Sequence, residues 1–268
     1  MNIKYAVIIP ARNEERYIGI SILSLKKQTI KPYVIIVVDD SSNDKTPEIA
    51  ERSGAIVIRI KRKSKAPATG TPYLAYVINK GLERIKKLEL DYAMISGADT
   101  IYPKDYVYKI ISRMINENVV LASGVAYGEY SSSLSIRGSG RVINAKWFKK
   151  IGFKYPENYG FETWLVFKAL SQGLRVKVYK DLKFFSFRKT SFNARKAYFY
   201  GKAMKALGYS YIYVIARFLY ATARYSASKS KYLILGYLKS NVRKYSDILY
   251  YTKYIQAKNL LYRLFKGT

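Results

Sequence analysis

The chain has 268 residues, 49% hydrophobic and 25% charged, a composition that can bury a core and excludes disorder in bulk. Its 48 Lys and Arg against 18 Asp and Glu give a net charge of +30, which favours polyanionic partners such as nucleic acid, anionic membrane surfaces or phosphorylated substrates. The absence of Cys and His excludes disulfides, thiolate nucleophiles and histidine catalysis, and any metal would meet oxygen ligands, as Mg²⁺ and Mn²⁺ prefer.

Short apolar runs alternate with helical patterns through the first hundred residues. The hydrophobicity of these runs is continuous, which predicts strands covered on both faces, as in a parallel sheet. Alternating strands and helices at this spacing predict a doubly wound α/β sheet, whose loops after the strands lie along one edge. Three such loops, "PARNEE", "DDSSND" and "GADT", all carry acids. The strands are predicted at residues 5–10, 33–40, 54–60 and 91–97, and the helices at 14–28, 45–54 and 71–89.

The stretch from 104 to 190 continues the mixture of helix and strand. A helix is predicted from residue 105, a strand from 119, a further helix near 162–172 and a strand at 174–181. Between them lies a Gly/Ser-rich loop, 131–141, which holds Arg137 and Arg141. We expect this loop to approach a ligand.

Composition changes after about residue 192. From there to the end the chain has 15 Lys and Arg and 14 Tyr against a single acid, Asp247. Three readings fit: an amphipathic helix at a membrane surface, a membrane span through the apolar run 207–223, and a soluble helical appendage or dimer interface. Peripheral membrane attachment is preferred, followed by oligomerisation.

Two motifs together resemble family 2 glycosyltransferases of the GT-A fold. They are "IIPARNEE" and "DDSSNDKT", and the residues that match the family pattern are Pro10, Asn13, Glu14, Asp39, Asp40, Ser42, Asp44 and Thr46. The resemblance implies a GT-A, Rossmann-like α/β domain over 1–190, with a mixed, mainly parallel sheet. Its nucleotide-sugar half is 1–103, its acceptor half is 104–190, and 191–268 forms a C-terminal helical extension.

The same resemblance implies which residues contact the nucleotide-sugar donor. Asn79 lies in "VINKGLE", which is similar to a helix of the family near the donor, and Lys65 is a candidate phosphate partner. The donor-binding residues expected in this sequence are Pro10, Ala11, Arg12, Glu14, Asp39, Asp40, Lys65, Asn79 and Ala98.

"GADT" stands where the family has a pair of acids that holds a divalent cation. The second acid corresponds to Asp99, and the first is replaced by Gly97. The resemblance implies that Asp99 binds a divalent cation, Mg²⁺ or Mn²⁺, that bridges the donor diphosphate. Because one carboxylate is missing, metal affinity is expected to be weaker or to be supplied in part by the substrate phosphates. The alternative is that Asp99 only caps a turn.

The segment "YGFETW" resembles the start of the family's catalytic helix. The family has Glu-Asp there, and this chain has Glu162 followed by Thr163, so Glu162 is the expected general base. Alternatively, Glu162 complements the dipole of its own helix, and the acceptor is an already ionised phosphate that needs no base. Expected acceptor-binding residues are Arg137, Gly138, Gly140, Arg141, Trp147 and Trp164.

These expectations together describe an inverting hexosyltransferase. It would transfer a sugar from a UDP- or GDP-sugar to a lipid phosphate or lipid-linked glycan at the cytoplasmic face of the membrane, without nucleic-acid partners. No signal peptide is recognised, and the richness in Lys, Ile and Tyr without Cys suits a heat-adapted source. Two alternatives stay open: a catalytically impaired relative, and a protein that binds polyanions or membranes.

Overall fold

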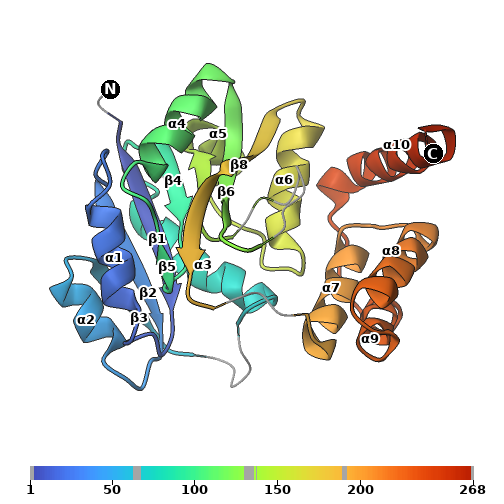
Figure 1. The fold of residues 1–268 in the computed structure, drawn as a ribbon, viewed down its shortest axis with the longest axis horizontal. Helices are drawn as coiled ribbons and strands as arrows, with labels where there is room; N and C mark the ends of the chain where they lie inside the picture. Colours follow the sequence, from blue (N-terminus) through green and yellow to red (C-terminus); the bar gives the residue numbers. More distant parts are fainter. Residues whose placement is uncertain (1–2, 63–67, 130–135, 137, 189–191, 267–268) are drawn as a thin grey trace. The chain divides into compact units, whose positions relative to one another are not determined.

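The computed structural model (Figure 1) describes residues 3–62, 68–129, 136, 138–188 and 192–266, with side chains as far as residue 258. The chain divides into two compact units. The sheet unit comprises 1–67, 76–155 and 173–189, and the helical unit comprises 68–75, 156–172 and 190–268.

The sheet unit is built on one sheet with the strand order β3-β2-β1-β4-β7-β6-β8-β5. The pairs from β3 through β4 and the pair β6–β8 are parallel, whereas β4–β7, β7–β6 and β8–β5 are antiparallel. The predicted mixed α/β sheet is confirmed. Its strands are β1 (Tyr5–Ala11), β2 (Val34–Asp40), β3 (Ile56–Ile60), β4 (Tyr92–Ile95), β5 (Thr100–Ile101), β6 (Val119–Ala126), β7 (Arg141–Asn144) and β8 (Arg175–Ser186).

Helices cover both faces of this sheet, as the continuous apolar runs predict. In β1, Val7 and Ile9 belong to the core cluster that includes helix α1. Ile8 points to the opposite face, where a Cβ added at Gly81 of helix α3 would lie 2.6 Å from the Ile8 side chain. Glycine at 81 therefore lets α3 approach the strands closely. The helices are α1 (Ile18–Lys26), α2 (Thr46–Arg52), α3 (Pro72–Ile85, starting in the helical unit), α4 (Tyr106–Asn116) and α5 (Ala145–Lys150).

Three short elements were not predicted from the sequence. Strand β5 has two residues, and β7 has four and directly follows the Gly/Ser-rich loop. Helix α5 has six residues, and its first turn is capped by the Asn144 side chain, which accepts a hydrogen bond from the Trp147 N–H at 3.0 Å. None is long enough to show a periodic pattern of its own.

The helical unit contains α6 (Phe161–Ser171), α7 (Ala194–Ala206), α8 (Tyr211–Arg224), α9 (Ala227–Leu238), the 3₁₀ turn η1 (Ser246–Ile248) and α10 (Leu249–Lys266). Helices α7 and α9 touch backbone to backbone: a Cβ at Gly201 would lie 2.0 Å from the Leu233 carbonyl oxygen, and one at Gly236 would lie 2.0 Å from that of Tyr198. Within the described residues, no helix has both the length and the apolar character needed to cross a bilayer. The predicted domain boundary at 190 stays a prediction.

Candidate functional site

The carboxyl ends of β1, β2 and β4 share one edge of the sheet, because these strands are parallel neighbours. The loops after β1 and β2 are tied together by motif residues. Asn13, with a φ of 53°, donates its backbone N–H to Ser42 Oγ at 2.9 Å and accepts from the Asn43 N–H at 2.9 Å. The buried Thr46 hydroxyl accepts from the Glu14 N–H at 2.7 Å. These hydrogen bonds therefore hold the loops after β1 and β2 together at this edge of the sheet.

Asp44 completes this connection between the two loops. Its carboxylate accepts from the Thr46 N–H at 3.0 Å and the Thr46 hydroxyl at 2.5 Å, and also from the Glu15 N–H at 3.2 Å. Burial favours the neutral acid, but these hydrogen bonds outweigh it and lower the pKa of Asp44. Asp44 thus remains an anionic acceptor that orders both loops.

Asp39 and Asp40 end β2 and differ in their surroundings, although both are 3% exposed. Asp40 forms an ion pair with Arg62, and both side chains are buried. Asp39 accepts one long hydrogen bond, 3.3 Å, from the Ser42 N–H through Oδ2. Its other oxygen, Oδ1, is buried and meets no hydrogen-bond partner in the part of the chain that the structure describes. Asp39 is thus an acceptor ready for an N–H of a ligand.

The turn after β4 explains why Gly97 stands in place of an acid. A Cβ at this position would lie 2.7 Å from Thr100 Oγ1 and 3.2 Å from both Asp99 Oδ1 and Ser139 Oγ. Ser139 Oγ also accepts a hydrogen bond from the Gly97 N–H at 2.9 Å. A side chain at position 97 would therefore press against Thr100, Asp99 and Ser139, which would have to move to admit an acid.

Asp99 is joined to the first loop by an arginine from the end of β8. Arg188 Nε donates to Asp99 Oδ2 at 2.9 Å, and Arg188 Nη2 donates to Glu14 Oε1. Burial raises the pKa of Glu14, and the Arg188 guanidinium opposes that shift. For Arg188, burial acts against the charge, but the two carboxylates outweigh it and raise the pKa, so the arginine stays charged.

A protein-held divalent cation does not fit this arrangement. The two carboxylates nearest the expected position, Asp99 and Glu14, already share one guanidinium. No group of three His, Cys, Asp or Glu side chains that could hold a metal ion occurs among the described residues. Position 97, where the family has a further acid, is a glycine, and a side chain there would press against Thr100 and Ser139.

Other predicted donor residues lie at the same edge or beneath it. Ala11 is buried and pairs in register with Asp39, and Pro10 and Arg12 are half-buried on either side of it. Arg12 Nε is buried and has no hydrogen-bond partner among the described residues. Ala98 is buried in the turn beside Asp99.

Asn79 is buried, and its amide holds the backbone of Tyr155. Its Nδ2 donates to the Tyr155 carbonyl at 2.8 Å, and its Oδ1 accepts from the Tyr155 N–H at 2.8 Å. Arg141, only 1% exposed, donates to the Tyr155 hydroxyl and to the Ile136 carbonyl oxygen, both at 3.1 Å. These contacts support the fold of the sheet unit, and the predicted ligand contacts of Asn79 and Arg141 stay predictions.

The remaining acceptor-side residues of the sheet unit lie around β7. Gly140 has a φ of 75°, and its Cβ would lie 2.6 Å from the Tyr106 hydroxyl, so only glycine fits there. Gly138 is half-buried, and Trp147 is buried. Lys65 and Arg137, both predicted to contact ligands, lie outside the described residues.

Glu162 and Trp164 belong to the helical unit. Glu162 is half-buried in the first turn of α6, after Gly160 with a φ of 75°. Trp164 is buried and donates its Nε1–H to the Asp247 carboxylate at 3.1 and 3.2 Å. Asp247 also pairs with Lys168 at 2.9 Å. The single acid of the C-terminal region thus ties η1 to α6.

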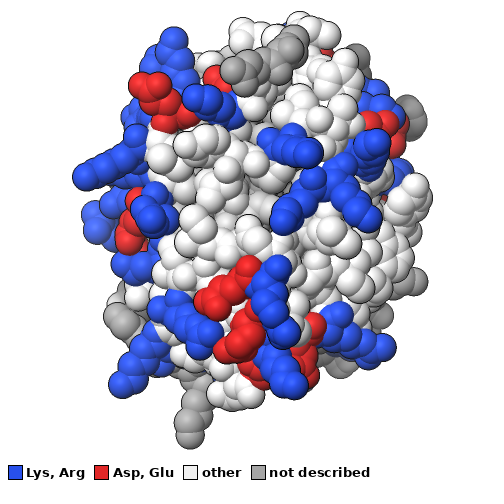
Figure 2. Space-filling model, turned by 90° about the vertical axis from the view of Figure 1, so that its left-hand side faces the viewer, with Lys and Arg blue, Asp and Glu red and all other residues white. Residues whose placement is uncertain are grey.

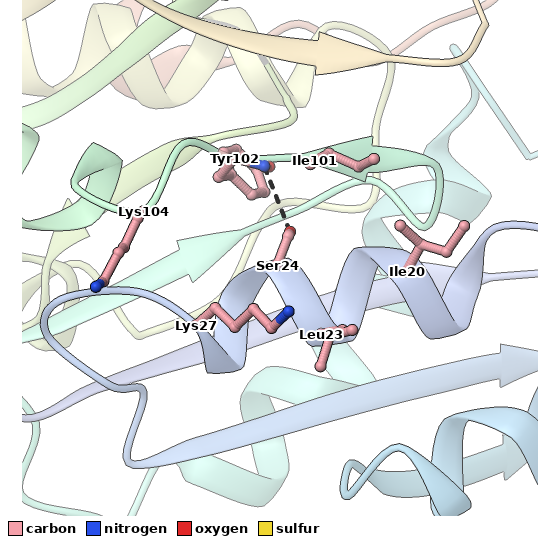
Figure 3. Close-up of a pocket in the computed structure, with 7 residues that line it drawn as sticks. All are labelled: Ile20, Leu23, Ser24, Lys27, Ile101, Tyr102 and Lys104. Atoms are coloured by element: carbon pink, nitrogen blue, oxygen red, sulfur yellow. Dashed lines mark hydrogen bonds between the residues drawn. The ribbon is translucent and has the colours of Figure 1, made fainter.

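The surface carries its positive charge in many places. On the face shown in Figure 2, Lys and Arg side chains are scattered, and acidic side chains lie beside basic ones. One exposed ion pair joins Arg59 and Glu48 at 2.9 Å. A separate cavity of about 460 Å³ lies between α1 and β5 (Figure 3). Its lining is mainly apolar and includes no predicted site residue: Ile20, Leu23, Ser24, Lys27, Ile101, Tyr102 and Lys104.

Sequence reasoning assigned no role to three residues of this edge, namely Arg62, Ser139 and Arg188. Arg62 lies in a basic run, "KRKSK", and Ser139 in a Gly/Ser loop, so neither stands out. For Arg188 the sequence offered one signal of a functional role: this residue follows a strand, as the three acidic loops do.

Comparisons with known proteins agree with this architecture. A family model described as "Glycosyl transferase family 2" matches residues 6–183. The low-salt glycan biosynthesis hexosyltransferase Agl6 of Haloferax volcanii is 31% identical over 121 residues, which cover 44% of this chain and 26% of that protein. The matches to the first curated relatives span between 14% and 26% of those relatives' lengths.

Solved structures share the fold at low sequence identity. The mannosyltransferase PcManGT from Pyrobaculum calidifontis, in complex with GDP-Man and Mn²⁺, is 15% identical with a TM-score of 0.61, over 98% of this chain and 81% of that chain. Glucosyl-3-phosphoglycerate synthase from Mycobacterium tuberculosis, with Mg²⁺ and UDP, is 16% identical with a TM-score of 0.58, over 78% and 80%. The predicted GT-A fold is confirmed.

Proposed function

The chain belongs to glycosyl transferase family 2, and from that premise we propose that it transfers a hexose from a UDP- or GDP-sugar to an acceptor, with inversion. An acceptor oxygen forms a bond to the anomeric carbon while the bond to the diphosphate oxygen breaks, and the electron pair leaves with the nucleoside diphosphate. A hydroxyl acceptor passes its proton to the Glu162 carboxylate, and an ionised phosphate acceptor needs no such transfer.

Asp39 carries the proposal for the donor. A buried carboxylate oxygen without a partner costs about 1–3 kcal/mol, so its retention calls for a compensating role. It stands at the carboxyl end of a central parallel strand, where ligands of α/β sheets bind. Uracil and guanine both present a ring N–H that this oxygen could accept. The nucleotide-sugar donors of the family carry bases with such a ring N–H group.

Replacing Asp39 with Asn should weaken nucleotide binding and leave the fold intact. The substitution converts a charge-assisted hydrogen bond into a mismatched one, worth about 1.5–3 kcal/mol, or about 10- to 150-fold in Kd. Stability should stay equal or rise, because among the described residues Asp39 accepts a single hydrogen bond, which is long at 3.3 Å. Calorimetric titration with UDP and GDP would measure the affinity, and urea unfolding the stability.

The matched control is Glu51→Gln, which removes one negative charge from the exposed part of α2. Its nucleotide affinity should equal that of the wild type. If neither UDP nor GDP binds the wild type at millimolar concentration, the donor-site proposal fails, and the polyanion-binding alternative takes its place.

For the acceptor we propose a lipid phosphate or lipid-linked glycan, reached from the cytoplasmic face of the membrane. Helix α8 supports this assignment because one of its faces is apolar and exposed: Tyr211, Ile212, Ile215, Leu219 and Tyr220 are each more than half exposed. Their spacing of one, three and four residues places them on one side of the helix. Together with the basic C-terminal composition, this face suits peripheral attachment to an anionic bilayer.

Replacing Ile215 and Leu219 with Glu should weaken vesicle binding by about tenfold for each side chain. Co-sedimentation would use vesicles of zwitterionic lipid with and without an anionic lipid. The control Ile115→Glu alters a similarly exposed residue of α4, 44% exposed, and should leave binding unchanged. Equal binding of all three proteins would favour an oligomer interface for α8 instead.

The divalent cation predicted at Asp99 is not part of the proposed reaction, because the carboxylates present do not fit a protein-held metal. The mannosyltransferase and the synthase were both solved with a divalent cation and a nucleotide ligand. In this chain Asp99 is paired with Arg188, and no step of the proposed reaction depends on a metal.

A further inference from the structure

The backbone around Arg188 is held in place from two sides. Strand β8 pairs with β5 through Thr100 and Ser186, and the Phe187 N–H then donates to the Asp99 carbonyl oxygen at 3.1 Å. The Phe187 ring stacks on Tyr17, with ring centroids 4.5 Å apart. Arg188 therefore leaves a fixed strand end, next to Asp99 and to the loop that carries Glu14.

The three charged groups differ in their access to solvent. The Glu14 and Asp99 side chains are 10% and 13% exposed, whereas the Arg188 side chain is 59% exposed. A guanidinium has five N–H donors, and the two ion pairs use one from Nε and one from Nη2. The carboxylates thus act as a rigid support behind a guanidinium that still has donors for a ligand.

We infer that Arg188 is the resident cation of this edge and that its guanidinium, rather than a protein-held divalent metal, contacts the diphosphate of the donor. This inference rests on the proposed function and specifies how that function's site receives its ligand. The chemistry suits the role, because a planar guanidinium binds phosphate oxygens through paired, charge-assisted hydrogen bonds.

Two further observations favour an arginine over a metal here. A metal ion held by Asp99 and Glu14 would lie beside the Arg188 guanidinium, which already pairs with one oxygen of each carboxylate, and the two positive charges would repel each other. A second acid at position 97 would also require the side chains of Thr100 and Ser139 to move. The net charge of +30 already attracts an anionic donor to the protein as a whole, so Arg188 mainly has to position the diphosphate.

The test compares nucleotide binding with and without divalent cations. Calorimetry with UDP and GDP would be run in EDTA and in Mn²⁺ on the wild type and on Arg188→Gln. We expect the wild-type Kd to differ by less than about threefold between the two conditions. Arg188→Gln should bind about 10- to 150-fold more weakly in EDTA. Mn²⁺ should restore part of that loss, because Glu14 and Asp99 are then free to hold a cation.

Arg16→Gln is the matched control, since it removes one exposed positive charge from the neighbouring loop, where Arg16 lies over the Tyr17 ring at 5.5 Å. It should bind like the wild type, and thermal unfolding would show that both variants fold. Wild-type binding that requires Mn²⁺, or equal binding by Arg188→Gln in EDTA, overturns the inference and leaves the proposed function standing. No binding of any nucleotide in either condition overturns both.

Discussion

Replacing Arg62 with Met is expected to lower the free energy of unfolding by about 3–5 kcal/mol, because it removes the Arg62 charge that pairs with the buried Asp40 carboxylate. The Arg62 and Asp40 side chains are 7% and 4% exposed. Methionine keeps most of the aliphatic length, and the Arg62 N–H keeps its hydrogen bond to Ser41 Oγ. The lost free energy of unfolding therefore measures the removal of the charge and not the opening of a cavity. Urea unfolding of the full chain would measure it.

The same unit provides the control. Arg59 pairs with Glu48 at 2.9 Å, but these side chains are 55% and 48% exposed. Arg59→Met should cost at most about 1 kcal/mol, since solvent screens an exposed pair. Adding Asp40→Asn to Arg62→Met should recover part of the stability, because the buried negative charge that Arg62 balanced is then removed as well. Equal losses for Arg62→Met and Arg59→Met would contradict the role assigned to the buried pair.

Replacing Glu162 with Gln is expected to lower kcat by about 100- to 10,000-fold if Glu162 removes a proton from the acceptor hydroxyl. The substitution preserves the size of a half-buried side chain in the first turn of α6 and removes only its ability to take up a proton. Nucleotide affinity should not change, since the nucleotide contacts are proposed at the strand ends of the sheet unit. Transfer rates and Kd values for the donor nucleotide would separate the two effects.

Glu157→Gln is a suitable control, because Glu157 is an exposed acid in the same segment of the helical unit. Its kcat should equal that of the wild type. An unchanged kcat for Glu162→Gln would instead support an acceptor that is already ionised, such as a phosphate, with Glu162 acting on the dipole of its own helix.

Local patterns were sufficient for much of the fold. The strands β1, β2 and β4 and the helices α1 to α4 follow from continuous apolar runs and helical periodicity, which are properties of neighbouring residues. The segments β5 and β7 were not recognised, because β5 has two residues and β7, "RVIN", lacks the continuous apolar run that marks the equally short β4, "YAMI". Their pairing depends on the strands on either side.

The motif residues were identified from the sequence, but the contacts of their side chains were not predicted. Asn13, Ser42, Asp44 and Thr46 mark the family, but the sequence does not say that their side chains bind one another's loops. Asp39 differs from these residues, because its Oδ1 has no hydrogen-bond partner in the part of the chain that the structure describes and is therefore available to a ligand.

The sequence by itself determined the family, the α/β architecture and the acids at the strand ends, because each of these depends on short stretches of chain. Only the tertiary structure decided how the charges pair. Arg188 is separated by 89 residues from Asp99 and by 174 from Glu14, and it meets both because β8 and β5 are paired beside the first loop. Electrostatic attraction acts over ångströms in space, so only the folded sheet brings this cation and these carboxylates together.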